Sequence, residues 1–178
     1  MECLPWPHCS EMAGAFSYRV LTPENAAAWH ALLLEGTRDF PIGFLLSHEE
    51  AVATSAARQR EILEAGTLRG VFGGAEMVGF CGFRRQAMAR TRHRAEVGPF
   101  FVTAAHQGRG LARAMMDGVC AEARAVGVVQ LELQVDVDNA RAIAFYKRYG
   151  FERMGTLKDS VLIEGQLYSD HLYRLRLG

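Results

Sequence analysis

The chain has 178 residues, enough for one domain with a core that can fold alone, and 49% of them are hydrophobic. Its 20 lysines and arginines balance its 20 aspartates and glutamates. This balance argues against a general affinity for nucleic acid or for an anionic membrane, so any anion-binding site must be local. We expect one globular domain that needs no partner for folding.

The first fifteen residues are predicted to form a flexible tail. They lack the basic segment and long apolar run of a signal peptide, and the sequence has no apolar stretch of about 20 residues that would cross a membrane. Cys3, His8 and Cys9 have no fourth ligand nearby, so we assign no metal site. The four cysteines form no CxxC motif, and Cys81 and Cys120 lie in apolar segments, which favours a reduced, cytoplasmic protein.

The next part of the chain is predicted to contain one strand and two helices. Residues 16–21 alternate in polarity like a short strand, and the Thr-Pro pair at 22–23 supplies an N-cap and a first-turn proline for a helix that ends at Gly36. A capping box at residues 47–50 begins a second helix, which lasts until about Gly66. Two helices therefore precede the main sheet.

The remaining sequence alternates strand and helix patterns. Hairpin strands are expected at 67–72 and 77–83 around a Gly73-Gly74 turn, followed by a strand at 95–103, a helix at 111–126, a strand at 128–135, a helix at 139–149, and two strands at 151–157 and 166–175 joined by a turn at 159–165. The predicted order is βααβββαβαββ. This order indicates an α+β or mixed α/β fold with one central sheet.

The stretch HQGRGLARAMMDG, residues 106–118, places two glycines between a predicted strand and a predicted helix. Glycine lets a ligand approach the main chain closely, and the first N–H groups of a helix together with its dipole attract anions. Arg109 and Arg113 are placed to add charge-assisted contacts. The stretch therefore predicts a site for a diphosphate group.

Two common nucleotide motifs do not fit this stretch. A Walker P-loop needs Lys and a hydroxyl residue after its last glycine, and neither follows Gly110. A dinucleotide fingerprint needs Gly or Ala where Arg113 stands, and its strand would begin too far along the chain. Asp136 and Asp138 are therefore not interpreted as ribose-binding acids.

A third motif fits. Residues 107–112, QGRGLA, match the [QR]xxGx[GA] motif of the GNAT acetyltransferase superfamily, and residues 139–151 resemble its second conserved block. The resemblance extends from residue 16 to the C-terminus and is strongest from 95 to 151. It implies a GNAT-like fold, with a central, mixed, mostly antiparallel sheet flanked by helices, and one acetyltransferase domain at 16–178. Ala104 stands where many relatives have proline.

The resemblance implies that acetyl-CoA is the cosubstrate, with its pyrophosphate at the glycine loop and its pantetheine arm along a splayed strand. Asn139 suits a helix cap as well as it suits a cofactor contact, and Arg141 is expected to be solvated. The residues implied to bind the cofactor are Phe101, Val102, Gln107, Gly108, Arg109, Gly110, Leu111, Ala112, Arg113 and Asn139.

Two side chains are candidates for catalysis. Tyr146 matches the family tyrosine that protonates the departing thiolate. Glu96 precedes Val102 by six residues, so the strand period predicts that both lie on one face and makes Glu96 a candidate base. A glutamate on a partly solvated strand face, or one paired with Arg92 or Arg94, explains Glu96 at least equally well.

In this family the two N-terminal helices and the last hairpin shape the acceptor site. The resemblance therefore implies an N-acetyltransferase, and we expect it to act on a primary amine of a small molecule. A peptide or protein amino group is the second interpretation, and a catalytically silent acyl-CoA-binding module is the third. A homodimer and acyl groups other than acetyl stay open. The acceptor-site candidates are Phe40, Phe44, Tyr168, Asp170 and His171. His48, His93 and His171 are expected to be ordinary surface or core residues and not catalysts.

Overall fold

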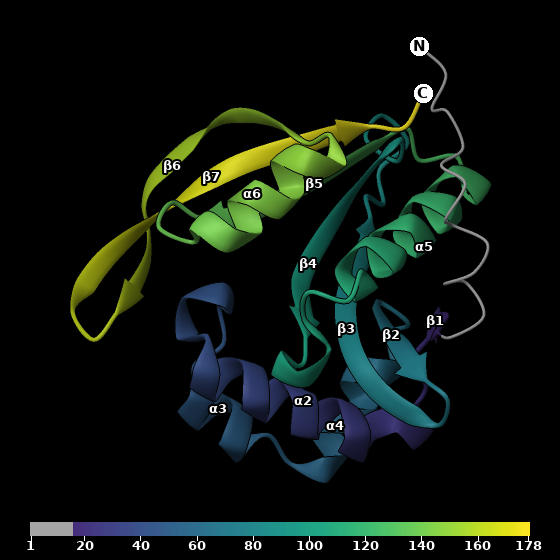
Figure 1. Ribbon diagram of the computed structural model, residues 1–178, viewed down its shortest axis with the longest axis vertical. Helices are drawn as coiled ribbons and strands as arrows, with labels where there is room; N and C mark the ends of the chain where they lie inside the picture. The colour runs from purple at the N-terminus through teal and green to yellow at the C-terminus, as the bar shows by residue number, and fades with distance from the viewer. Residues whose placement is uncertain (1–15) are drawn as a thin grey trace.

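A computed structural model describes residues 16–178, in which strands and helices follow the predicted order with one additional helix (Figure 1). The predicted tail, residues 1–15, lies outside the described residues. The strands are β1 Phe16–Val20, β2 Leu68–Gly73, β3 Glu76–Arg85, β4 Arg94–Val102, β5 Gln130–Asp136, β6 Glu152–Ile163 and β7 Gln166–Arg176. The α-helices are α2 Ala26–Asp39, α3 His48–Ala53, α4 Ala56–Glu64, α5 Leu111–Ala125 and α6 Ala140–Tyr149, and the 3-10 turns are η1 Pro23–Asn25, η2 Pro41–Gly43 and η3 Ala104–His106.

The strands of the described chain form one seven-stranded sheet in the order β1-β2-β3-β4-β5-β7-β6. Every neighbouring pair is antiparallel except β4 and β5, which are parallel. The expectation of a central, mixed, mostly antiparallel sheet flanked by helices is confirmed. The one parallel pair lies in the middle of the sheet, where it interrupts the antiparallel pattern.

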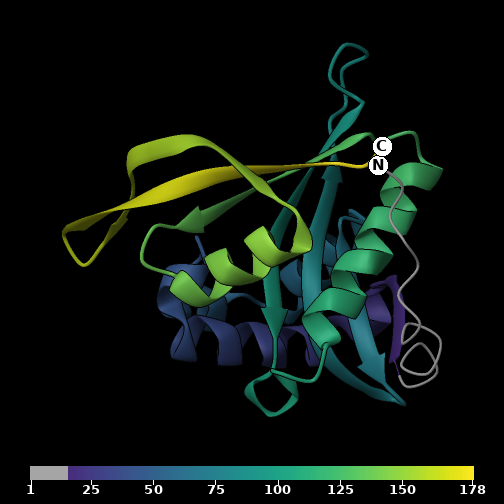
Figure 2. The same cartoon turned by 45° about the horizontal axis from the view of Figure 1, so that its top comes forward.

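Helices pack on both faces of the sheet and bury two separate apolar clusters. On one face α5 and α6 cover a cluster that includes Met115, Val119 and Tyr146. On the other face α2 and α4 cover a cluster that includes Trp29 and Leu63. Figures 1 and 2 show the N-terminal helices grouped together, with α5 and α6 lying apart from them.

The predicted second helix, residues 47–66, is two helices, so the expectation of one continuous helix is wrong. The capping box at Ser47 is present, but the chain becomes extended at Thr54 and Ser55 after only six helical residues. Ser55 then starts α4, because its hydroxyl accepts a hydrogen bond from the N–H of Arg58 at 3.2 Å. A second N-cap inside a helical pattern marks this break.

Gly36 does not end the first helix, which continues to Asp39. A Cβ atom at Gly36 would lie 2.5 Å from Cζ of Phe44 and 3.2 Å from Cδ2 of Phe101. The glycine therefore allows the helix to approach the sheet and the following loop closely, which is a packing role and not a stop signal.

The two hairpin turns differ slightly from their predicted positions. Gly73 belongs to β2, and the first turn begins at Gly74. At the C-terminal hairpin β6 continues to Ile163, and the register shifts between Leu157 and Val161. Asp159, with φ of 54°, therefore lies in a bulge of a strand and not in the predicted turn.

Candidate functional site

The parallel strands β4 and β5 are paired along only part of their length. Their ladder joins Arg94, Ala95 and Glu96 to three residues of β5, whereas β4 stays paired with β3 as far as Val102. Beyond Glu96 the two strands diverge, as Figures 1 and 2 show. The expected splay is present, and it leaves main-chain groups on the β5 side of β4 available to a ligand.

A bulge lies in β4 where the splay begins. Cys81 and Phe83 of β3 are two residues apart, but their partners Phe100 and Val97 are three apart. Gly82 accommodates the extra residue, because a Cβ atom there would collide with the carbonyl oxygen of Gly98. An extra residue reverses the in-and-out alternation for the rest of the strand.

The expectation that Glu96 and Val102 share a face is therefore wrong. Val102 packs in the same apolar cluster as Val97, under α5. The side chain of Glu96 is 44% exposed and forms an ion pair with Arg84 at 3.3 Å. The expected alternative partners, Arg92 and Arg94, do not take this place. Arg94 pairs with Glu132 at 3.0 Å, and the main-chain carbonyl of Arg92 accepts a hydrogen bond from Arg85.

A cavity of about 590 Å³ opens at the splay. Its walls come from the loop after α2, from the diverging ends of β4 and β5, from α6, and from the β6–β7 hairpin. The cavity brings together Glu96, Asn139 and Tyr146, three of the residues predicted from sequence. Of the five acceptor-site candidates Phe44, Tyr168 and Asp170 line the cavity, and Phe40 and His171 are not among its lining residues.

Tyr146 reaches the cavity from α6. Its ring is 7% exposed and meets Phe100 and Phe151 edge-on, with centroids 6.3 and 5.5 Å away. The Tyr146 hydroxyl is protonated at neutral pH, because the ordinary tyrosine pKa is about 10 and burial raises the pKa of Tyr146 further. No hydrogen bond to another residue within 16–178 occupies that hydroxyl, which leaves its proton available to a bound molecule.

The glycine loop exposes a run of main-chain donors. Gly108 and Gly110 have φ of 76° and 80°, and Gly110 is the N-cap of α5. The N–H groups of residues 108–113 find no acceptor in the described chain, and the first paired one is that of Ala114, which donates to the Gly110 carbonyl at 3.0 Å. These donors and the helix dipole produce positive potential at one spot, as an anion site requires.

Side chains around the loop contribute unequally. Leu111 is 1% exposed and belongs to the core, so only its main chain can meet a ligand. Arg109 is exposed, and Arg113 is 64% exposed at 3.9 Å from Asp117. Both arginines have room to move toward an anion. The loop therefore supplies main-chain dipoles and exposed cationic side chains.

Gln107 connects the loop to the splayed strand. Its Nε2 donates to the carbonyl of Val102 at 2.8 Å, and its Oε1 accepts from Arg141. Arg141 was expected to be simply solvated; it is exposed but also holds Gln107. Asn139 caps α6, because its Oδ1 accepts from the N–H of Ala142 at 3.1 Å. The capping role of Asn139 is confirmed, and its place in the cavity lining keeps the cofactor role open.

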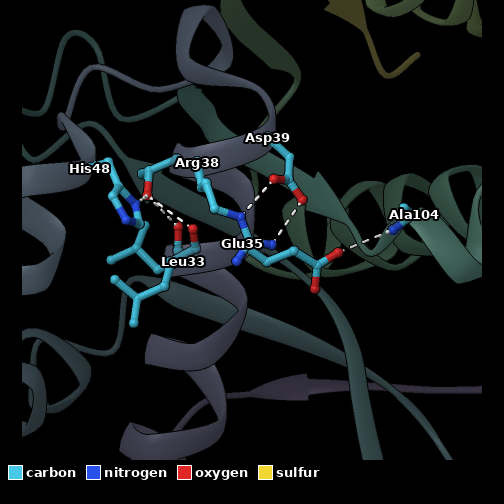
Figure 3. Close-up of polar contacts among 8 residues, drawn as sticks. Leu33, Glu35, Arg38, Asp39, His48 and Ala104 are labelled. Carbon is cyan, nitrogen blue, oxygen red and sulfur yellow. Dashed lines mark hydrogen bonds and ion pairs between the residues drawn. The ribbon is translucent and has the colours of Figure 1, made fainter.

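A hydrogen bond joins η3, the turn before the glycine loop, to α2. The N–H of Ala104 donates to Oε1 of Glu35 at 3.2 Å (Figure 3). Proline has no N–H, so the departure from the family pattern at Ala104 is used here for a contact. His48 lies nearby, with its Nδ1 3.0 Å from Oγ1 of Thr37, and this contact between α3 and α2 agrees with its expected structural role.

Sequence reasoning missed a buried ion pair that anchors α5. Arg69 of β2 meets Glu122 of α5 at 2.6 Å, and the hydroxyl of Tyr18 in β1 donates to the same carboxylate at 2.8 Å. Burial alone would raise the pKa of Glu122, but the hydrogen bonds from Arg69 and Tyr18 hold it below its usual value. The three residues are far apart in the sequence, so no short-range pattern signals them.

Asp136 was also missed, because it had been considered only as part of a dinucleotide motif. It is 5% exposed at the end of β5 and lines the cavity. Within residues 16–178 no group of three His, Cys, Asp or Glu side chains is placed to hold a metal ion. No helix in the same range is long and apolar enough to cross a bilayer. Cys3, His8 and Cys9 lie outside the described residues.

Comparison with known proteins gives one consistent family. The model of the acetyltransferase (GNAT) family matches residues 29–151. The L-amino acid N-acetyltransferase AaaT of Escherichia coli K12 is 37% identical over 103 residues, which are 57% of this chain and 62% of AaaT. The N-alpha-acetyltransferase RimI of Mycobacterium tuberculosis H37Rv is 35% identical over 97 residues, 54% of this chain and 58% of RimI. The matches thus span less than two thirds of each relative, 62% of AaaT and 58% of RimI.

Solved structures share the fold at low sequence identity. An acetyltransferase of the GNAT family from Streptococcus pneumoniae has a TM-score of 0.80 and 18% identity, covering 90% of this chain and 99% of that one. The yncA protein of Salmonella typhimurium, solved with its cofactor acetyl-CoA, has a TM-score of 0.76 and 18% identity, covering 92% and 95%. The arrangement of sheet and helices is therefore common to all three proteins.

Proposed function

The chain belongs to the acetyltransferase (GNAT) family, and on that premise we propose that it transfers the acetyl group of acetyl-CoA to a primary amine of a small molecule. The observation that carries the proposal is the run of free N–H groups at 108–113 beside a splayed strand that leads into a cavity containing Tyr146. The name of AaaT, an L-amino acid N-acetyltransferase, supports a small acceptor. The name of RimI, an N-alpha-acetyltransferase, supports a peptide or protein amino group as the second candidate.

The residues present fit coenzyme A. A pyrophosphate suits the N–H groups of 108–113, with Arg109 and Arg113 near enough to add charge. The pantetheine arm, which carries amide groups, suits the part of β4 that does not pair with β5, at Phe101 and Val102. When bound, acetyl-CoA supplies the thioester that is the acetyl donor. The remaining residues that we assign to its binding are Gln107, Gly108, Gly110, Leu111, Ala112 and Asn139.

Tyr146 is the proposed acid. The departing thiolate of CoA needs a proton, and Tyr146 offers a protonated hydroxyl at the cavity with no hydrogen-bond partner among the described residues. The incoming amine has the opposite need, because an α-amine has a pKa of about 7.7 to 8.0 and a lysine amine about 10.4. A base or a chain of waters must take its proton.

Glu96 is the candidate base, with its ion pair to Arg84 as the competing explanation. Glu96 and Val102 are not on one face, but Glu96 lines the cavity, and this position supports its role as the base. Comparing Glu96→Gln with Arg84→Gln separates the two explanations by steady-state turnover. A base is expected to be worth roughly a hundredfold in turnover for Glu96→Gln alone. If both substitutions change turnover equally and only slightly, the ion pair with Arg84 remains as the explanation of Glu96.

The test of the proposed function is release of CoA thiol from acetyl-CoA with a panel of amines, amino acids and peptides. Release with small amines or amino acids is the expected result, and release with peptides alone would favour the second candidate. A calorimetric titration with CoA accompanies the panel. Binding of CoA without release of CoA thiol for any amine would favour a silent acyl-CoA-binding module and would contradict the proposed enzymatic function.

A further inference from the structure

Two buried aspartates are cross-strand neighbours in the lining of the cavity. Asp136 of β5 and Asp170 of β7 are directly opposite partners in the antiparallel ladder. Directly opposite residues point to the same face of a sheet, with Cβ atoms about 4.5–5.5 Å apart. The two residues are 5% and 7% exposed, and both line the cavity.

In each carboxyl group one oxygen accepts a hydrogen bond from the protein. The N–H of Asp138 donates to Oδ1 of Asp136 at 2.8 Å, and the hydroxyl of Ser160 donates to Oδ2 of Asp170 at 2.8 Å. The other oxygens, Oδ2 of Asp136 and Oδ1 of Asp170, have no partner within residues 16–178. They are not among the side-chain atoms of this range that are both sealed from solvent and unpaired. A ligand can therefore reach them.

The cations of the cavity are engaged elsewhere. Arg58 pairs with Glu61 at 2.9 Å and Arg84 pairs with Glu96 at 3.3 Å. In the described part of the chain, no Lys, Arg or His forms an ion pair with Asp136 or Asp170. Like charges directly opposite one another destabilise a sheet, and buried carboxylates are normally paired. The arrangement therefore lacks one cation.

The rest of the cavity indicates what kind of cation it would take. The cavity lining also includes apolar side chains, Ile42 and Leu46 from the loop after α2 and Val161 and Ile163 from the β6–β7 hairpin, together with polar ones such as Gln134 and Tyr168. An inorganic ion would leave these apolar side chains in contact with water. An organic ammonium group with an apolar substituent would satisfy both the acids and the apolar side chains.

We propose that Asp136 and Asp170 together bind an ammonium group of the acceptor, while its apolar part packs on the loop after α2 and on the β6–β7 hairpin. The inference rests on the proposed function, which supplies the amine. The two aspartates then select a cationic acceptor. If the bound group is the reacting amine, the pair also disfavours the product, because an amide carries no charge.

The experiment is a calorimetric titration in saturating CoA, which permits no acetyl transfer, with benzylammonium and its neutral analogue benzyl alcohol as probes. Wild type is expected to bind benzylammonium at least about tenfold more tightly than benzyl alcohol. Asp136→Asn and Asp170→Asn should each weaken benzylammonium binding by about tenfold or more and leave benzyl alcohol unchanged. The matched control is Asp138→Asn, which removes an exposed carboxylate two residues from Asp136 and keeps the main-chain donor.

Equal affinity of wild type for the two probes, or unchanged benzylammonium affinity in both Asn variants, would overturn the proposal. The wild-type comparison holds even if an Asn variant does not fold, which a thermal melt reports. Steady-state kinetics separate the two sources of the ammonium. A raised KM of Asp136→Asn for monoamines assigns the pair to the reacting amine, whereas a raised KM for diamines alone assigns it to a second cationic group.

Failure of the subsite and failure of the proposed function give different results. A wild-type protein that releases CoA thiol with amines, yet does not distinguish benzylammonium from benzyl alcohol, loses the subsite and keeps the function. A wild-type protein that prefers benzylammonium by tenfold, yet releases no thiol with any amine, keeps the subsite and loses the function. Titrating benzylammonium without CoA extends the test to a protein that does not bind CoA.

Discussion

The glycine loop at 107–113 and the acceptor cavity lie at the two ends of one splay, but they are built from different parts of the chain. The loop offers main-chain N–H groups from consecutive residues. The cavity collects side chains from the loop after α2, from β4 and β5, from α6 and from the β6–β7 hairpin. A site made of main chain follows from local conformation, whereas a site made of side chains depends on how distant elements pack. The two regions should therefore respond to substitution in different ways.

Substitution of Tyr146, which lines the cavity, should give the largest effect. Tyr146→Phe keeps the ring and removes only a hydroxyl that has no partner among the described residues, so stability should hold while turnover falls by roughly ten-to-the-second to ten-to-the-fourth. CoA affinity should change little. The measurements are single-turnover kinetics, a thermal melt and a CoA titration.

The matched control is Tyr149→Phe, three residues along the same helix. The hydroxyl of Tyr149 donates to Asp117 at 2.5 Å, and Tyr149 does not line the cavity. This variant should lose about 1 kcal/mol of unfolding free energy and keep its turnover. Near-normal turnover of Tyr146→Phe with chemistry rate-limiting would remove the acid and leave the cofactor site unaffected.

Gly110→Val should affect the glycine loop alone. Valine at a residue with φ of 80° would strain the N-cap of α5 and add a branched side chain beside the exposed N–H groups, so CoA affinity should fall by roughly a hundredfold or more. Gly127→Val is the control, because Gly127 has φ of 75° near the other end of α5 and open space around its Cβ position. Both variants carry backbone strain, but only Gly110→Val should lose CoA in calorimetry. Equal affinities would exclude the loop as the pyrophosphate site.

Glu122→Gln tests the anchor that holds α5, and with it the glycine loop, on the sheet. Removing the carboxylate leaves the 7% exposed side chain of Arg69 without its partner, which should lower the free energy of unfolding by about 1–3 kcal/mol at pH 7. Glu61→Gln, in an exposed pair with Arg58, should change it by less than about 0.5 kcal/mol. Denaturant titrations measure both.

The pH dependence of this pair follows from the lowered pKa of Glu122. Its contribution is fully present above the unfolded pKa of about 4.3 and is lost as the pH falls through the lower folded pKa. The stability difference between wild type and Glu122→Gln should therefore be constant from pH 7 to about pH 5 and shrink below about pH 4. A difference that grows on acidification would contradict the assignment.

Glu35→Ala should give the smallest effect. Glu35 joins α2 to η3, the turn before the glycine loop, through its hydrogen bond with Ala104, and the contact is exposed (Figure 3). Its loss should lower the free energy of unfolding by about 0.5–1 kcal/mol, with Glu64→Ala at the exposed end of α4 near zero. A change in CoA affinity beyond about twofold would contradict the view that the glycine loop depends only on its local main-chain conformation, and would show that it also depends on α2.

Sequence patterns predicted most elements and their order, because polarity periods and caps are local properties. These patterns failed where a contact with a residue distant in the sequence determined the local structure. Gly36 looked like a helix end, but it makes room for Phe44 and Phe101. The alternation between Glu96 and Val102 was reversed by a bulge that depends on a contact between Gly82 and Gly98. Neither partner is visible in the local pattern.

The sequence by itself determined the glycine loop, because its chemistry belongs to the main chain and both glycines, the strand before them and the helix after them are contiguous. Tertiary structure alone decided which carboxyl groups share the cavity. Asp136 and Asp170 meet because the register of β5 and β7 places them opposite each other. Arg69 and Glu122 meet because α5 packs against the sheet. Side-chain sites need a register and a packing geometry that no short segment contains.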